Sequence, residues 1–287
     1  MFEAVDHPYR VPYDGSTELA ALSTTPPTDA PEKKALKDRL KDVRQEVAEL
    51  QRAMYAQDQW SLLVVFQALD AAGKDGTIRH VFRGVNPAGC QVFSFKKPSA
   101  EELDHDFLWR TTNRLPERGR IGVFNRSYYE EVLVVRVHPE LLRYQRLPRV
   151  DLETIWSERF DSIRDFERHL ARNGTAVVKF FLNVGKDEQL ERFRARIDEP
   201  EKNWKFSDAD VKERGFWDQY QHAFEQTLRQ TSRSCAPWYA IPADDKHYMR
   251  LTVAEILRDT LRSIDPRYPD VGPERVAELQ RMRDELV

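Results

Sequence analysis

Residues 64–78 read VVFQALDAAGKDGTI and are the most informative segment of the sequence. An apolar, β-branched run (SLLVVFQ, Ser61–Gln67) ends in a turn of small residues, followed by Gly73-Lys74 and the start of a helix. This is the context of a phosphate-binding loop, because backbone N–H groups and the helix dipole face an anion at such a turn. Gly73 lets the backbone approach the anion closely, and Lys74 adds a charge that can follow a transferred phosphoryl group.

The loop departs from the pattern G-x-x-x-x-G-K-[ST] at two positions. Ala68 stands in place of the first glycine, and Asp75 stands in place of the Ser/Thr whose hydroxyl usually binds magnesium. Asp70 is the replacement that we predict, because a carboxylate is a hard oxygen ligand. The backbone expected to bind phosphate or nucleotide comprises Ala71, Ala72, Gly73, Asp75, Gly76 and Thr77. The segment alone leaves open an ordinary strand–turn–helix corner with a surface lysine.

Short β-rich runs alternate with helical patterns along the rest of the chain. Strands are predicted at Ser61–Gln67 and at residues 90–95, 121–124, 176–184 and 239–241, and helices at 99–115, 151–172, 187–197, 207–229 and 252–264. Crossovers of this length join parallel strands. The pattern therefore predicts an α/β protein with three layers, α/β/α, around a mainly parallel sheet.

The ends of the chain differ from this central part. Residues 1–30 are rich in Pro, Thr, Ser and Asp and predict an extended N-terminal arm, residues 31–265 a catalytic domain, and residues 266–287 a tail with a charged helix. After the N-terminal arm, apolar residues spaced three and four apart form one seam along a predicted helix: Leu36, Leu40, Val43, Val47, Leu50 and Met54. This seam either packs on its own domain or forms a subunit contact.

Composition limits the class of protein. Hydrophobic residues make up 40% of the chain, enough for a packed core, and the net charge of −3 gives no overall positive field for nucleic acid. No apolar stretch approaches the length of about 18 residues that a membrane helix needs, and a secretory signal pattern is not seen. The two cysteines, Cys90 and Cys235, are too few for a disulfide framework. We expect a soluble cytoplasmic protein.

A second group of polar residues follows the predicted strand at 121–124, in the sequence IGVFNRSYYEE (121–131). Ligands of open α/β sheets bind at the carboxyl edge, where such residues lie. Arg126 can clamp a phosphate there, and Glu130 or Glu131 can hold a metal directly or through water. The alternative is a helix N-terminus stabilised by acidic residues.

The third segment is QLERFRARIDEPEKNWK (189–205). Arg192 and Arg196 are four residues apart and share a helix face. Pro200 ends that helix, and Lys202 and Lys205 flank Trp204. Beside a phosphate loop this segment predicts a helical lid, at about residues 190–215, that closes cations over phosphates. The alternative is a solvated helical hairpin.

Residues 108–150 carry an excess of positive charge in a nearly neutral protein. The arginines are Arg110, Arg114, Arg118, Arg120, Arg126, Arg136, Arg143, Arg146 and Arg149, against the acids Glu117, Glu130, Glu131 and Glu140. Arginine favours bidentate phosphate contacts. The natural inference is a positive groove for a polyanion.

Together these segments resemble the polyphosphate kinase 2 family over residues 33–264. The motifs that carry the resemblance are ALDAAGKDG (68–76), FNRSYYEEVLVVRVHPE (124–140), RIDEPEKNWKFS (196–207) and APWYAIPADDK (236–246). The resemblance implies a P-loop kinase-like α/β/α fold with a helical lid. It also implies phosphoryl transfer between inorganic polyphosphate and nucleotides, with Mg²⁺ or Mn²⁺.

The resemblance also implies roles for single residues. Asp70, Lys74, Arg126 and Glu130 are the expected catalytic residues, with Asp70 and Glu130 as metal ligands; Asn125 and Arg136 bind phosphate or nucleotide; and Arg192, Arg196, Lys202 and Lys205 are the lid cations that bind polyphosphate. The form Asn-Arg-Ser-x-Tyr-Glu, which contains Asn125 and Glu130, is similar to the subgroup that phosphorylates both AMP and ADP. Ala68 fits the same subgroup.

We therefore predict reversible, direct in-line phosphoryl transfer from inorganic polyphosphate to AMP and ADP by a homodimer or homotetramer. Catalysis of this kind is mainly alignment and charge neutralisation. The alternatives are an ATP-dependent nucleoside or nucleotide monophosphate kinase and a non-enzymatic sensor of polyphosphate or nucleotides. The acids at metal-ligating positions argue against a sensor.

Overall fold

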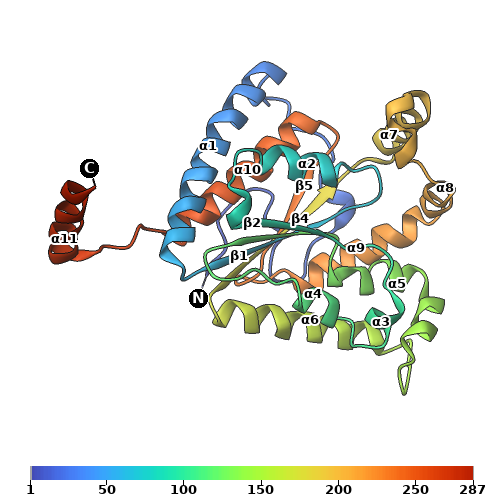
Figure 1. Ribbon diagram of the computed structural model, residues 1–287. Helices are drawn as coiled ribbons and strands as arrows, with labels where there is room; N and C mark the ends of the chain where they lie inside the picture. Colours follow the sequence, from blue (N-terminus) through green and yellow to red (C-terminus); the bar gives the residue numbers. More distant parts are fainter. Residues whose placement is uncertain (1, 287) are drawn as a thin grey trace.

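The computed structural model describes residues 2–286, and within them five parallel strands form one sheet in the order β2-β3-β1-β4-β5. The strands are β1 (Ser61–Gln67), β2 (Cys90–Ser94), β3 (Ile121–Asn125), β4 (Thr175–Asn183) and β5 (Trp238–Pro242) (Figure 1). Each lies within about one residue of its predicted range, so the prediction of a parallel sheet is confirmed.

Strand β1 lies at the centre of the sheet, between β3 and β4. Leu62 pairs with Ile121 of β3 and with Ala176 of β4, and every residue of the three strands is buried. Strands that are covered on both faces read as continuous apolar runs rather than as alternating ones. The arrangement places the carboxyl ends of β1 and β3 side by side.

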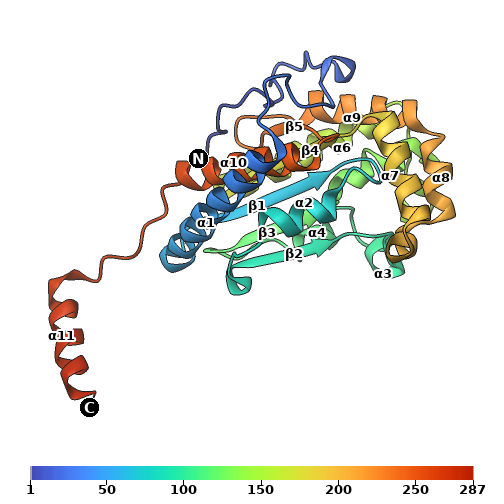
Figure 2. The same ribbon diagram turned by 90° about the horizontal axis from the view of Figure 1, so that it is seen from above.

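Helices cover both faces of the sheet, which gives the three layers (Figures 1 and 2). Helices α1 (Lys33–Gln57), α2 (Lys74–Val81) and α10 (Lys246–Ser263) lie on one face, and α6 (Ile155–Arg172) and α9 (Trp217–Thr231) lie on the other. Helix α10 packs against α1, α2 and β5, and α6 packs against β4 and α9. The predicted α/β/α architecture is confirmed.

The apolar seam of α1 packs inside its own chain. Val47 and Met54 are fully buried, and Leu36, Leu40 and Val43 are nearly so, where α1 lies along α10. The seam therefore belongs to the core of its own domain, which is the first of the two alternatives that the sequence left open.

The N-terminal arm is extended but firmly held. The Val11 N–H donates to the Trp238 carbonyl, and the Ala240 N–H donates to the Tyr9 carbonyl, both over 2.9 Å. Phe2, Val11 and Leu19 are buried. Strand β5 is an edge strand of the sheet, and an edge left open is a template for unwanted pairing. The arm covers this edge.

Two predicted helices are each divided in the structure. The range 99–115 forms α3 (Ala100–Leu103) and α4 (Trp109–Thr112), and the range 207–229 forms α8 (Asp208–Arg214) and α9. The carboxylate of Asp106 accepts the Leu108 N–H, and such local bonds compete with a helix. At Gly215 the second division occurs, between α8 and α9.

Helix α7 (Lys186–Asp198) and α8 are joined through the 3₁₀ turn at Pro200–Lys205 and form a hairpin at the carboxyl edge of the sheet (Figures 1 and 2). We call residues 186–214 the lid hairpin. Helix α5 (Val134–Val137) and the 3₁₀ turn Tyr128–Glu131 follow β3. The remaining 3₁₀ turns are Leu19–Ala21, Pro87–Gly89 and Pro139–Gln145.

The last helix, α11 (Gly272–Glu285), lies apart from the body at the end of an extended segment (Figures 1 and 2). None of its residues is buried. Among residues 2–286 we find no helix that combines the length and the apolar character needed to cross a membrane.

Candidate active site

The loop between β1 and α2 (residues 68–73, the β1–α2 loop) adopts a backbone that ordinary residues avoid. Gly73 caps α2 with a φ of 105°, and Ala71 has a φ of 62°. A residue with a Cβ is strained at positive φ, so Gly73 is required by the turn and Ala71 is held there by its surroundings. The first N–H groups of a helix have no partner within it, so the start of α2 is suited to bind an anion.

Lys74 is the first residue of α2 and its side chain folds back over the loop. Its Nζ donates to the Ala68 carbonyl over 2.8 Å and to the Leu69 carbonyl over 3.4 Å. Burial, with the nearby Arg126 charge, lowers the pKa of Lys74 to about 8, although the carboxylates of Asp70 and Glu130 oppose this change. Lys74 is therefore a partly desolvated cation at the centre of the site.

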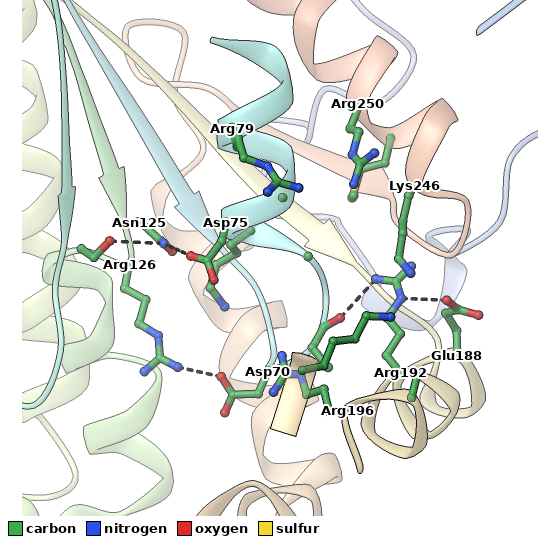
Figure 3. Close-up of a pocket in the computed structure, with 18 of the residues that line it drawn as sticks. Asp70, Asp75, Arg79, Asn125, Arg126, Glu188, Arg192, Arg196, Lys246 and Arg250 are labelled. Atoms are coloured by element: carbon green, nitrogen blue, oxygen red, sulfur yellow. Dashed lines mark hydrogen bonds and ion pairs between the residues drawn. The ribbon is translucent and has the colours of Figure 1, made fainter. Parts of the chain in front are cut away.

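The end of β3 supplies the residues that face this loop. Arg126, with a φ of 64°, directs Nη2 to within 2.6 Å of Asp70 Oδ1 (Figure 3). The Asn125 Nδ2 donates to Asp75 Oδ1 over 2.5 Å. The two predicted groups of site residues, after β1 and after β3, thus meet in space because their strands are neighbours in the sheet.

Glu130 lies on the other side of Arg126. Its Oε2 is 3.5 Å from Arg126 Nη1. Burial raises the pKa of Glu130, while the charges of Arg126 and Lys74 act to lower it. In turn Glu130, together with Asp70, raises the pKa of Arg126 against the effect of its own burial. Arg126 therefore lies between two carboxylates.

A cavity of about 760 Å³ opens beside the loop, between α2, α10 and the lid hairpin (Figure 3). Cations outnumber acids on its walls: Lys74, Arg79, Lys96, Lys97, Arg126, Arg192, Arg196, Lys202, Lys246 and Arg250, against Asp70, Asp75, Glu188 and Glu191. Within the described residues, the buried Arg250 Nε lacks a hydrogen-bond partner. A buried donor of this kind is satisfied at little cost by an anion. We call this space the basic cavity.

A second cavity, of about 450 Å³, also has Arg126 on its wall. Its walls include apolar and aromatic side chains: Leu69, Leu133, Val134, Phe193, Trp217, Tyr220 and Phe224. The polar residues Glu130, Gln189, Asp210 and Glu213 also line it. Asp70, Lys97 and Arg126 line both cavities, so the two spaces meet at these residues. We call the second space the aromatic cavity.

Three of the predicted lid cations line the basic cavity in different ways. Arg192 is buried and donates to the carbonyls of Ala71, Ala72, Ala243 and Asp244, so it clamps the β1–α2 loop. Arg196 pairs with Asp210 over 3.1 Å, and Lys202 pairs with Glu199. The side chain of Lys205 lies outside the described part of the chain.

Three other predicted residues line neither the basic cavity nor the aromatic cavity. Ala72 is buried, and the Thr77 hydroxyl donates to the Gly73 carbonyl inside α2. Arg136 lies over the rings of Trp156 and Phe160, 5.8 Å from each ring centre. Arg136 lines a separate hollow beside His222.

The arginine-rich range 108–150 contributes little to the two cavities described above. Of its nine arginines, Arg126 is the one that lines either of the two cavities described above. Arg110 and Arg118 donate to backbone carbonyls, and Arg146 pairs with Asp104. A local sum of charge misleads because it counts arginines that the fold already uses.

Five cations of the basic cavity come from positions that the sequence analysis did not single out. Lys96 and Lys97 follow β2, and Lys246 and Arg250 lie on α10 after β5. Arg79 lies on α2. Four of these follow predicted strands, so the rule that ligands bind at the carboxyl edge was a signal that could have found them.

Known proteins resemble the chain in sequence and in structure. Residues 30–269 match the family model described as polyphosphate kinase 2. An ADP-polyphosphate phosphotransferase of Rhodopseudomonas palustris is 57% identical over 84% of this chain and 84% of its own. An AMP/ADP-polyphosphate phosphotransferase of Meiothermus ruber is 45% identical over 94% of this chain and 97% of its own.

A crystal structure of polyphosphate kinase 2 from Arthrobacter aurescens TC1 superposes with a TM-score of 0.86 and 36% identity, over 97% of this chain and 99% of that one. The family match covers the sheet, the β1–α2 loop, the end of β3 and the lid hairpin, which are the parts that build the two cavities. The chain belongs to the polyphosphate kinase 2 family.

Proposed function

We propose that the protein transfers phosphoryl groups from inorganic polyphosphate to AMP and ADP, reversibly and by direct in-line transfer. The observation that carries this proposal is the meeting of a basic cavity and an aromatic cavity at Asp70, Lys97 and Arg126. A phosphate chain needs cations along its length, whereas a nucleoside needs apolar and aromatic walls with a few polar groups. The basic cavity and the aromatic cavity meet at these residues, so a phosphate chain in one and a nucleotide in the other would come together there.

The phosphate chain lies in the basic cavity in this proposal. Arg79, Lys246 and Arg250 carry its distal phosphates, and Lys74 and Arg126 hold the terminal one at the junction. Arginine and lysine suit different parts of this task, because arginine binds phosphate in a fork and lysine acts as a mobile point charge. The nucleoside occupies the aromatic cavity, with its phosphates directed toward Arg126.

The phosphoryl transfer needs no general base to activate the attacking oxygen. An anionic oxygen of the nucleotide's terminal phosphate attacks the terminal phosphorus of the chain, the bridging P–O bond breaks, and its electrons stay on the shortened polyphosphate. Phosphate oxygens already carry negative charge near neutral pH, so the protein's work is alignment and charge stabilisation. Lys74 and Arg126 supply that charge.

The residues at the junction fit a divalent cation, Mg²⁺ or Mn²⁺. Among the described residues there is no cluster of three His, Cys, Asp or Glu side chains that could form a cage. Magnesium in kinases is commonly held by one or two carboxylates together with substrate phosphates, and Asp70 and Glu130 offer two such carboxylates on either side of Arg126. The ion would neutralise phosphate charge there.

The acceptor range follows from the groups at the end of β3. Asn125 adds no charge beside Asp75, and Glu130 faces the aromatic cavity. We propose that a cation held by Glu130 replaces part of the missing phosphate charge when AMP is bound. The names of the two relatives, one for ADP and one for AMP/ADP, support both acceptors.

The experiment that tests the proposal offers AMP and ADP each with polyphosphate or with ATP, in the presence of Mg²⁺, and resolves the nucleotide products. We expect ADP from AMP and ATP from ADP with polyphosphate as donor. If ATP but not polyphosphate served as donor, the protein would be an ATP-dependent kinase. Binding of these substrates without turnover would identify a sensor.

A pair of variants on α10 tests the basic cavity. Arg250→Gln should raise the KM for polyphosphate and leave the KM for nucleotide unchanged. Arg258→Gln is the matched control, because Arg258 lies on the same helix but pairs with Asp259 and does not line either cavity. Equal effects of the two substitutions would contradict the assignment of the cavity.

A further inference from the structure

Gln189 lies at the base of the lid hairpin and was not among the predicted site residues. Gln189 belongs to α7 and is buried, and both the nitrogen and the oxygen of its side-chain amide form hydrogen bonds. The Nε2 donates to the backbone carbonyl of Asp70 over 3.0 Å, and the Oε1 accepts from Arg214 Nη1 over 2.6 Å. One side chain thus joins α7, the end of α8 and the β1–α2 loop.

Gln189 links Arg214, which holds the lid hairpin together, to Asp70, which lies at the junction of the two cavities. Arg214 is the last residue of α8 and also donates to the Lys186 carbonyl at the start of α7, so it ties the two legs of the hairpin together. Asp70 carries the carboxylate that pairs with Arg126 at the junction of the cavities. The contact of Gln189 is with the backbone of Asp70, so it fixes where that residue's side chain originates.

We propose that Gln189 is a positioning residue that holds Asp70 in register with the lid hairpin, so that the carboxylate is correctly placed when both legs of the hairpin are docked. This inference rests on the proposed function, in which Asp70 acts at the junction of the two cavities. Displacement of a catalytic group by about 1 Å can lower the rate by about 10²-fold. A buried amide that fixes the position of such a group therefore has a large effect on the rate.

Gln189→Leu tests the proposal because leucine keeps the apolar bulk and removes both hydrogen bonds. The matched control is Gln51→Leu, since Gln51 is also a buried glutamine whose Nε2 donates to a backbone carbonyl, that of Gly89, away from both cavities. Both substitutions remove a buried amide. The control therefore shows the effect of lost stability alone.

Two readouts distinguish positioning from general stability. In the protein without substrates, Gln189→Leu should speed hydrogen exchange of the Ala72 and Thr77 amides, which bond within the β1–α2 loop and its junction with α2. With substrates, kcat should fall by about tenfold or more even at nucleotide concentrations that saturate the aromatic cavity, which Gln189 also lines. Gln51→Leu should change neither.

A double substitution tests the path of the effect. If Arg214 acts on Asp70 through Gln189, Gln189→Leu combined with Arg214→Met should lower kcat no further than the larger single effect. Multiplied losses would overturn this path, as would unchanged loop exchange in Gln189→Leu. The exchange measurement needs no substrate, so it can fail while the parent enzyme is active, and an inactive parent would count against the proposed function instead.

Discussion

The guanidinium of Arg126 lies 2.6 Å from the carboxylate of Asp70, although 56 residues separate the two along the chain. Asp70 follows β1 and Arg126 follows β3, which are neighbours in the sheet. The pair stands at the junction of the basic and aromatic cavities. The two groups are hydrogen-bond partners, and under the proposed function incoming phosphates compete with Asp70 for the guanidinium.

Lys74→Met should lower kcat by about 10²–10³, because removal of one preorganised charge from the transition state has this effect. Methionine keeps the apolar part of the side chain, so the fold should persist. Initial rates with ADP and polyphosphate measure the loss, and circular dichroism checks the fold. A folded variant with nearly parental turnover would remove Lys74 from the site.

The same residue predicts a pH dependence of stability. Burial lowers the pKa of Lys74 to about 8, whereas a lysine in the unfolded chain has a pKa of about 10.4. The unfolded chain therefore binds more protons between these values, and stability from this group rises with pH across that window. The Tm of Lys74→Met relative to the parent should fall from about pH 7.5 to about pH 10. A constant difference would contradict the lowered pKa.

Asp70→Asn should impair the use of Mg²⁺ most. The amide keeps the shape of the side chain but loses the charge of a hard metal ligand. The Mg²⁺ concentration that gives half-maximal rate should rise, and this shift is measured by titration at saturating substrates. If the titration curves of variant and parent coincide, Asp70 does not replace the missing Ser/Thr of the loop.

Glu130→Gln should reduce transfer to AMP more than transfer to ADP. Under the proposed function Glu130 holds a cation that offsets the missing phosphate of AMP, and ADP needs this help less. Initial rates for both acceptors in parent and variant give the ratio. An equal loss for AMP and ADP would exclude this role.

The strands and the meeting of the two loop ends could be predicted from the sequence. Continuous apolar, β-branched runs such as Ser61–Gln67 are typical of strands covered on both faces, and the carboxyl-edge rule brings Asp70 toward Arg126. The break within residues 99–115 could not be predicted with equal ease, because local hydrogen bonds such as that from the Leu108 N–H to the Asp106 carboxylate compete with the helix there. Short-range competition of this kind leaves the helical period unchanged.

The use of individual cations depended on tertiary structure. Arg192 and Arg196 share a helix face as expected, but Arg192 is directed at the carbonyls of the β1–α2 loop, which a helical pattern does not reveal. Gln189 is the first residue of the segment 189–205, but it carries no charge and the helical pattern gives no sign of its link to Asp70, which emerges only from the packed structure.

The most direct test of the account follows the phosphoryl group itself. The protein is incubated with ³²P-labelled polyphosphate, unlabelled ADP and Mg²⁺, and quenched in acid during the first turnover. Direct transfer at the junction of the two cavities predicts label in the γ-phosphate of ATP and none bound covalently to the protein. Label retained on the protein, or ATP that stays unlabelled while polyphosphate is consumed, would contradict direct transfer from polyphosphate to the nucleotide.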